Sequence, residues 1–299
     1  MKSALTKIKS NIKVEVEKHE KEKKKKDDCE EMHRCVGMIS RKFKIDELEK
    51  MKYQQWDCVS ITEDKLLKFA QNVELREKAI RYSRNSFMKV YPTGMRFDSS
   101  NCDPTKSWIC GAQISALNLQ STDDDFVLLN KVFFQINRGL GFILKPEFLR
   151  NENAEVKTYK NPCLNLFIKI ISGVMLQNIL KVDGVVESID SLAVSIKIVG
   201  SYEDDINNKE YFTKYINQNF INPIFDNETV NFKVYEADLS FLIIKVFYSK
   251  NILARTIIPL MIIEEGIRTV KLYDNKCKEI VNSTLVLKVN KTPLTMKDY

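Results

Sequence analysis

The sequence is short of histidine, which limits the chemistry that the chain can perform by itself. Only two histidines occur among the 299 residues, His19 and His33, and both lie in a strongly charged stretch near the N-terminus. Histidine is the side chain most often used for proton transfer near neutral pH. Neither histidine lies in a segment with the apolar periodicity of a strand or helix, so we expect no histidine-based catalytic centre in this chain.

The cysteines lack the spacing of a disulfide framework or of a zinc site. They number seven, which is odd, and no CxxC pair occurs. This pattern is typical of free thiols in a reducing compartment and argues against structural disulfides and bound zinc.

Long apolar runs are also absent. The longest, from Ile252 to Ile263, is interrupted by Arg255 and Pro259 and is too short to span a bilayer. The N-terminus has no apolar core of a signal peptide. The net charge of +7 is mild and compatible with anionic lipid, and no basic stripe interleaved with aromatics indicates nucleic acid. We predict a cytoplasmic protein that is peripheral at membranes.

The content of apolar residues, 44%, supports folded domains, and the length allows two of them. Residues 1–34 hold 11 Lys/Arg and 8 Asp/Glu and predict a charged linker or helix. A lipid contact through Lys23–Lys26 is the alternative, but the acidic residues that follow offset this charge.

Residues 35–150 alternate between short apolar segments and a helical pattern. Apolar residues recur at helical spacing from Glu63 to Ser83. Strands alternating with helices predict parallel βα units, and about four strands correspond to half of an eight-stranded barrel. Such a half would expose two unpaired edges. The predicted strands are Cys35–Ile39, Phe87–Tyr91, Ala112–Leu119 and Gly141–Leu144.

Residues 151–162 are polar, lack periodicity and predict a linker, and the pattern then changes to strands alone. Residues 163–299 contain short alternating segments typical of a β-sandwich. We expect no helices in this part. The predicted strands are Leu164–Ser172, Leu192–Val199, Val230–Val234, Leu239–Phe247, Ile252–Pro259, Thr269–Leu272 and Ser283–Val289.

Several motifs occur in one collinear order and carry a family resemblance. They are Tyr91-Pro92-Thr93-Gly94, Asp98-Ser99-Ser100-Asn101, Gly111-Ala112-Gln113 and the run from Gly139 to Arg150. Together they resemble the Y half of the catalytic barrel of eukaryotic phosphoinositide-specific phospholipase C, in its delta-like form.

The second region continues this resemblance. The segments Leu164–Gly173 and Phe220–Phe225 are similar to the first strand and the Asn-Pro-aromatic turn of the C2 domain that follows the barrel in this family. The resemblance implies a fold class of α/β plus all-β: half of a TIM (β/α)8 barrel, the Y-box, followed by an antiparallel C2 β-sandwich.

The resemblance implies a reaction and also shows which parts of it this sequence lacks. The family hydrolyses phosphatidylinositol 4,5-bisphosphate to diacylglycerol and inositol trisphosphate, with two histidines and a bound calcium ion in the preceding X half. We find neither the histidine motifs nor an acidic calcium set. We therefore predict no catalytic residue in this chain, calcium only in the complete enzyme, and the X half, in the same or another chain, as a partner.

The Y half in this family recognises the headgroup and contacts the membrane. The resemblance implies that Lys89, where the family has arginine, binds a phosphate and that Tyr91 stacks on the inositol ring. It also implies that Ser60 contacts a phosphate and that Met95 is an apolar rim residue dipping into the bilayer.

Each residue also has an ordinary structural interpretation. Lysine keeps the charge of arginine but loses its planar fork. Ser60 or Thr62 suits a helix N-cap, Lys89 and Tyr91 suit a barrel surface, and Met95 suits a core.

The C2 region offers few carboxylates for calcium. Asp183 and Asp190 lie in the first loop, whereas the later loop, Val246 to Asn251, contains no aspartate. Two carboxylates on one loop bind calcium poorly, so we predict that this chain binds no metal.

Three functions remain open from the sequence. The chain is part of a phospholipase C, or a catalytically inactive phosphoinositide-binding relative, or a scaffold with neither activity.

Overall fold

The computed structural model describes residues 35–43, 54–122, 124–176, 191–217 and 219–295. The chain divides into two compact units, residues 1–40 and residues 41–299. The predicted charged linker, residues 1–34, lies outside the described residues, and the predicted domain limits stay predictions. The buried strand predicted for Cys35–Ile39 is wrong: residues 35–40 are exposed, and strand β1 (Ile39–Arg41) begins only at Ile39. A five-residue apolar run is too short to specify both strand and burial.

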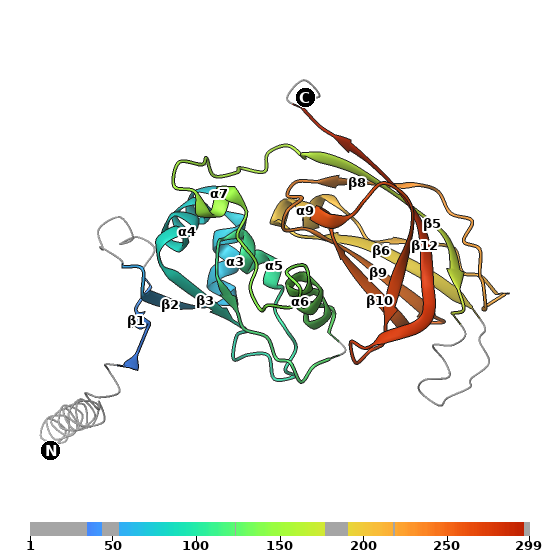
Figure 1. Ribbon diagram of the computed structural model, residues 1–299, viewed down its shortest axis with the longest axis horizontal. Coiled ribbons are helices and arrows are strands. Elements are labelled where there is room, and N and C mark those ends of the chain that lie inside the picture. The colour runs from blue at the N-terminus through green and yellow to red at the C-terminus, as the bar shows by residue number, and fades with distance from the viewer. Residues whose placement is uncertain (1–34, 44–53, 123, 177–190, 218, 296–299) are drawn as a thin grey trace, which may run out of the picture. The chain divides into compact units, whose positions relative to one another are not determined.

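The first part of the larger unit is a parallel sheet with helices. Strands β2, β3 and β4 lie side by side in that order and run parallel. Inward residues of β2 and β3, such as Val59 and Met88, form a core with Leu66 of α3 and Ala79 of α4, so these helices cover one face of the sheet (Figure 1). The elements are β2 (Asp57–Thr62), α3 (Glu63–Gln71), α4 (Val73–Asn85), β3 (Phe87–Tyr91), α5 (Pro104–Ile109), β4 (Ile114–Ser115), α6 (Asp125–Gln135) and α7 (Glu147–Arg150).

The strand predicted at Phe87–Tyr91 is confirmed at both ends, but neighbouring elements differ from prediction. The single helical pattern from Glu63 to Ser83 is two helices, because Asn72 leaves the helical conformation and its side chain accepts a hydrogen bond from the Leu75 amide. The predicted strand Ala112–Leu119 shortens to the two residues of β4. Strand β2 was not predicted.

The predicted strand Gly141–Leu144 is not a strand. The carbonyl oxygen of Phe142 accepts a hydrogen bond from the side chain of Asn137, through Nδ2, and not from a neighbouring strand. Leu140, Phe142 and Leu144 are each more than 60% exposed. In a closed barrel the last strand is held by strands on both sides, and no such pair flanks this segment among the described residues.

The second part of the larger unit is an antiparallel sandwich, as predicted. One layer is β7-β6-β9-β10 and the other is β11-β12-β5-β8, joined through the single pairing of Arg255 with Tyr273. The apolar side chains between the layers form one large core. The strands are β5 (Leu164–Val174), β6 (Leu192–Val199), β7 (Tyr211–Phe212), β8 (Val230–Val234), β9 (Phe241–Tyr248), β10 (Asn251–Pro259), β11 (Gly266–Tyr273) and β12 (Glu279–Pro293).

Helical turns occur in this region, contrary to prediction. Helix α9 (Tyr202–Asn207) follows β6, and a 3-10 turn, η2 (Leu260–Ile262), follows β10. Helix α9 begins with a capping box, in which Ser201 and Asp204 each accept a hydrogen bond from the other's backbone amide. A Ser-x-x-Asp signal was therefore present in the sequence.

The half-barrel and the sandwich share an apolar core within the larger unit. Trp108 of α5 and Phe133 of α6 have ring centroids 4.4 Å apart, and both lie beside Phe241 of β9. The linker between the two parts takes part, because Tyr159 is buried under the guanidinium of Arg76, 4.7 Å from its ring centre. The half-barrel and the sandwich are consequently joined by one continuous apolar core.

Candidate functional site

The parallel register of β2 and β3 brings together the residues singled out in the sequence. Ser60 is paired with Lys89, and Thr62 is paired with Tyr91. Strand residues alternate between faces, and Met88 and Val90 point to the helix-covered side. Lys89 and Tyr91 therefore lie with Ser60 on the other side, which we call the open sheet face.

The open sheet face is accessible and carries an uncompensated charge. Tyr91 is 38% exposed, Ser60 is exposed and Lys89 is half-buried. Among the described residues, Lys89 has no acidic partner. Thr62 stands at the N-cap position of α3 as predicted, but its side chain makes no capping hydrogen bond.

The turn after β3 is fixed by an ion pair with the first turn of α3. Arg96 Nε donates to Glu63 Oε1 at 2.6 Å, and Arg96 Nη2 donates to Glu63 Oε2 at 2.7 Å. The Thr93 amide also donates to Glu63. Burial acts to raise the pKa of Glu63, but these hydrogen bonds outweigh it and hold the pKa below its ordinary value. The hydrogen bonds that Arg96 donates to Glu63 raise the pKa of Arg96.

This ion pair presents two apolar side chains to solvent. Met95 and Phe97 flank Arg96 and are 72% and 87% exposed. Exposure contradicts the interpretation of Met95 as a core residue. Phe97 was missed, because nothing in the sequence distinguishes an exposed phenylalanine from a buried one.

The loop that follows is held by hydrogen bonds between side chains and the backbone. The Asn118 amide donates to Asn101 Oδ1 at 2.6 Å, and Asn101 Nδ2 donates back to the Asn118 carbonyl. Asn118 Nδ2 reaches the carbonyl oxygens of Ser99 and Ser100. These amides have structural partners, which leaves Ser60, Lys89 and Tyr91 as the open polar groups of the site.

The described residues hold no group of three or more His, Cys, Asp or Glu side chains that could bind a metal ion. The candidate ligands Asp183 and Asp190, and both histidines, lie outside the described residues. The later loop of the sandwich is a tight turn between Tyr248 and Asn251 without a carboxylate.

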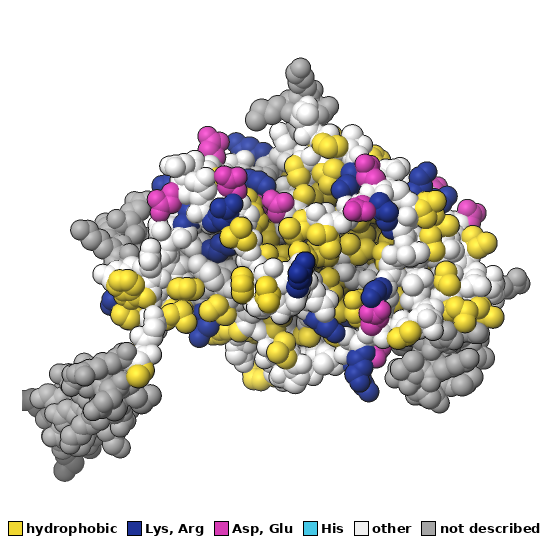
Figure 2. Space-filling model, in the orientation of Figure 1, with side chains coloured by type: hydrophobic (Ala, Val, Ile, Leu, Met, Phe, Trp, Pro, Cys, Tyr) yellow, Lys and Arg dark blue, Asp and Glu magenta, His cyan; other side chains and the backbone are white. Residues whose placement is uncertain are grey.

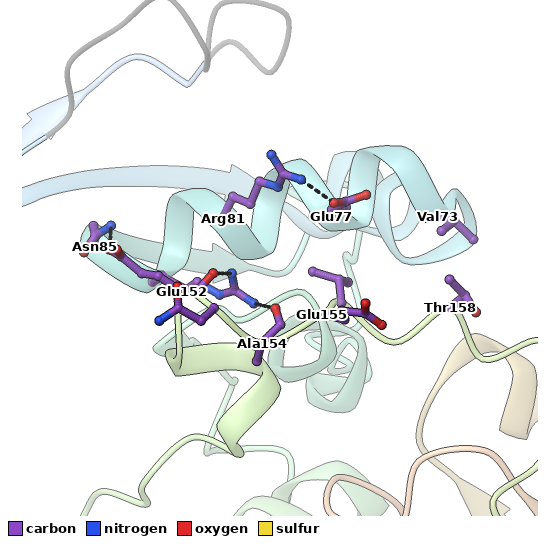
Figure 3. A pocket seen from close by; sticks show the side chains of 11 residues that line it. Val73, Glu77, Arg81, Asn85, Glu152, Ala154, Glu155 and Thr158 are labelled. Carbon is purple, nitrogen blue, oxygen red and sulfur yellow. Dashed lines mark hydrogen bonds and ion pairs between the residues drawn. The ribbon is translucent and has the colours of Figure 1, made fainter.

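A cavity of about 730 Å³ lies away from the open sheet face, between α4 and residues 152–158 of the linker. Arg84 donates to the carbonyl oxygens of Phe148, Glu152 and Ala154. Figure 3 shows Glu152 and Ala154 of the linker beside helix α4, on which Arg81 is paired with Glu77. The predicted linker is thus tied to the half-barrel.

None of the described helices is long and apolar enough to cross a membrane. In Figure 2 the apolar side chains of the visible face form separate groups among charged side chains of both signs.

Comparisons with known proteins agree with this architecture. Residues 33–148 match the family model described as phosphatidylinositol-specific phospholipase C, Y domain. The crystal structure of L. pealei PLC21 superposes with a TM-score of 0.76 at 25% identity, over 95% of this chain and 37% of that chain.

Two curated relatives show the same kinship. The human 1-phosphatidylinositol 4,5-bisphosphate phosphodiesterase gamma-2 is 30% identical over 226 residues, which are 71% of this chain and 17% of the relative. The human inactive phospholipase C-like protein 1 is 31% identical over 257 residues, 82% of this chain and 23% of the relative. The chain thus spans less than a quarter of either relative. It belongs to the phosphoinositide-specific phospholipase C family and corresponds to its C-terminal part, the Y half of the barrel followed by a C2 domain.

Proposed function

We propose that this chain is the headgroup-binding and membrane-contacting part of a phosphoinositide phospholipase C. The complete enzyme would hydrolyse phosphatidylinositol 4,5-bisphosphate to diacylglycerol and inositol trisphosphate in lipid signalling. The observation that carries the proposal is the parallel pairing of Ser60 with Lys89 and of Thr62 with Tyr91 on the open sheet face. In barrels of this type, ligands bind at the carboxyl ends of the strands, where Tyr91 ends β3.

Three side chains have the chemistry that an inositol phosphate requires. The Lys89 ammonium group, which lacks an acidic partner among the described residues, would pair with a phosphate. The Ser60 hydroxyl on the adjacent strand would donate a hydrogen bond to the same anion. The Tyr91 ring would cover a face of the inositol ring through its apolar surface.

The turn at Met95 would contact the bilayer itself. The Arg96–Glu63 ion pair orders this turn, so little conformational entropy remains to be lost when Met95 enters the interface. We infer a peripheral membrane location in the cytoplasm.

The X half is the partner that the open edges of the half-barrel require. Strand β4 pairs only with β3 among the described residues, and Leu140, Phe142 and Leu144 are exposed apolar residues of a segment that forms no strand. An unpaired strand edge beside exposed apolar groups is typical of a surface that another segment covers. We infer that the X half adds its strands at these edges.

The described residues do not fit the calcium ion that the complete enzyme would use, because they include no cluster of suitable ligands. We therefore place its ligands in the X half and assign this chain no step that involves the metal.

The alternative is a phosphoinositide-binding protein without catalysis. One relative that matches 82% of this chain is named as inactive. Lysine at position 89 also supports this alternative, since lysine binds phosphate less directionally than arginine does.

Sedimentation with phosphatidylcholine vesicles, with and without phosphatidylinositol 4,5-bisphosphate, tests headgroup binding. Lys89→Ala should weaken the phosphoinositide-dependent binding about tenfold, as expected for one charge-assisted hydrogen bond. Lys89→Arg should strengthen it, because the guanidinium binds phosphate in a bidentate manner. Lys68→Ala, an exposed lysine on α3, is the matched control.

If Lys89→Ala and Lys68→Ala behave alike, the assigned headgroup site is wrong. Adding a separately produced X half and measuring inositol trisphosphate release then separates the two candidates. Release that depends on both halves supports the enzyme, whereas binding without release supports the inactive relative.

A further inference from the structure

The two outward faces of the sandwich each carry a pair of cations on directly opposed strand positions. On one side, Lys245 of β9 faces Arg255 of β10. On the other side, Lys169 of β5 faces Lys288 of β12. Like charges directly opposite each other destabilise a sheet unless something compensates them, so each pair requires an explanation.

The first pair is compensated by the half-barrel. Asp125, the first residue of α6, accepts from Arg255 Nη1 at 3.0 Å and pairs with Lys245 Nζ at 2.5 Å. Around it, Ile243 and Ile257 pack in the core shared with the half-barrel. We call this side, the outward side of β7-β6-β9-β10, the covered sandwich face.

The second pair has no such partner among the described residues. Neither Lys169 nor Lys288 takes part in an ion pair or a side-chain hydrogen bond there, and Lys288 is exposed. A third lysine, Lys233 of β8, is exposed and lies on the same side, opposite Asn165. We call this side, the outward side of β11-β12-β5-β8, the open sandwich face.

The surroundings of the second pair indicate a partner with an extended anionic surface. Positions 165 and 169 of β5 are about 13 Å apart, at roughly 3.3 Å per residue, so the cations are spread over the sheet. Ile267 of β11 lies opposite Lys288 and is 66% exposed. Lysines next to an exposed apolar side chain are typical of surfaces that rest on a bilayer interface.

The composition of the two pairs favours lipid over a protein carboxylate. The covered pair includes an arginine, whose rigid fork holds Asp125 in place. The open pair consists of two lysines, whose flexible stems carry compact charges that suit mobile headgroups. We propose that the open sandwich face binds the surface of an anionic bilayer through Lys169, Lys288 and Lys233, without calcium and without recognising a particular headgroup.

This proposal adds a second membrane contact to the proposed function and can fail independently of it. The probe is therefore a phosphatidylcholine vesicle containing phosphatidylserine but no phosphoinositide, in the presence of a calcium chelator. The full chain should bind these vesicles, and binding should weaken as ionic strength rises. Lys169→Ala combined with Lys288→Ala should weaken it about thirtyfold, from the usual contribution of a lysine near an anionic leaflet.

Two further variants distinguish a loss of vesicle binding from a loss of the folded structure. Lys209→Ala with Lys214→Ala removes the same charge from exposed positions near β7 and should change binding little. Lys288→Glu should raise the thermal midpoint, because it replaces a like-charge pair by an opposite-charge pair, while it weakens vesicle binding.

Equal losses in the two double variants, or equal binding to vesicles with and without phosphatidylserine, would overturn the proposal. A Lys169/Lys288 variant that keeps vesicle binding but no longer associates with the X half would identify the face as a protein-docking surface, and the lipid proposal would be wrong.

Discussion

The covered sandwich face and the two open faces of this molecule differ in whether their cationic side chains have acidic partners. On the covered sandwich face, Lys245 and Arg255 share Asp125 and lie next to a tight apolar core. On the open sheet face and the open sandwich face, Lys89, Lys169 and Lys288 have no acidic partner among the described residues. The covered sandwich face is thus neutralised by the chain itself, whereas the open faces keep lysines that have no acidic partner in the described part of the chain.

The largest expected effect comes from removing an aromatic side chain at the centre of the core that the half-barrel and the sandwich share. Trp108→Ala should lower the free energy of unfolding by about 3–5 kcal/mol, because it removes a buried ring between Phe133 and Phe241. Urea denaturation followed by circular dichroism measures this. Trp56→Ala, at a residue 47% exposed, is the matched control and should cost much less. Equal losses would mean that the half-barrel and sandwich do not share a core.

The second prediction removes the carboxylate that neutralises the covered cation pair. Asp125→Ala should cost about 3 kcal/mol, because Arg255, only 2% exposed, would lose a charged partner in a buried place. The control is Glu77→Ala, which breaks the exposed pair with Arg81 and should cost about 0.5 kcal/mol or less. A small cost for Asp125→Ala would remove the physical contrast between the two sandwich faces.

The sequence predicted the parts of this architecture that local patterns determine. Strand β3 was predicted at both ends, because apolar alternation stops at Pro92. The order of motifs singled out Ser60, Lys89 and Tyr91, and the structure brings them to one face. Their roles in binding stay predictions.

What the sequence did not predict depends on contacts between distant segments. Gly141–Leu144 has the composition of a strand but lacks flanking strands, so its backbone is not paired into a sheet. Strand β2 was not predicted because Thr62 and Glu63 have the pattern of a helix start. The structure confirms that helix start, since Thr62 is the N-cap of α3. The Lys169–Lys288 pairing follows from register alone, and residues so far apart in sequence give no local sign of it.

The third prediction concerns the linker between the half-barrel and the sandwich, which Arg84 ties to α4. Arg84→Met should cost about 2 kcal/mol, because three backbone carbonyl oxygens lose a charged donor. Hydrogen exchange should become faster in residues 151–158 (Figure 3). Arg81→Met, at an arginine 68% exposed, is the control and should leave this segment protected. Unchanged exchange in the Arg84 variant would show that the shared core alone holds the linker.

The smallest expected effect concerns the turn that presents Met95 and Phe97. Glu63 is an acid whose pKa is lowered in the folded state from 4.5, so its contribution is present above that pH and is lost as pH falls through the folded pKa. Arg96 stays charged over this pH range, so the pH-dependent change in the stability of the ion pair comes from Glu63. Glu63→Gln should therefore cost about 1 kcal/mol at neutral pH, the usual worth of a partly exposed ion pair.

The same variant should resemble the parent chain in acid. Thermal midpoints of the two proteins, measured from neutral pH down to about pH 3, should converge below pH 4.5. A constant difference over this range would mean that Glu63 acts through packing and not through its charge. If vesicle binding falls over the same pH interval in the parent alone, the ion pair is what holds the Met95 turn in position to meet the bilayer.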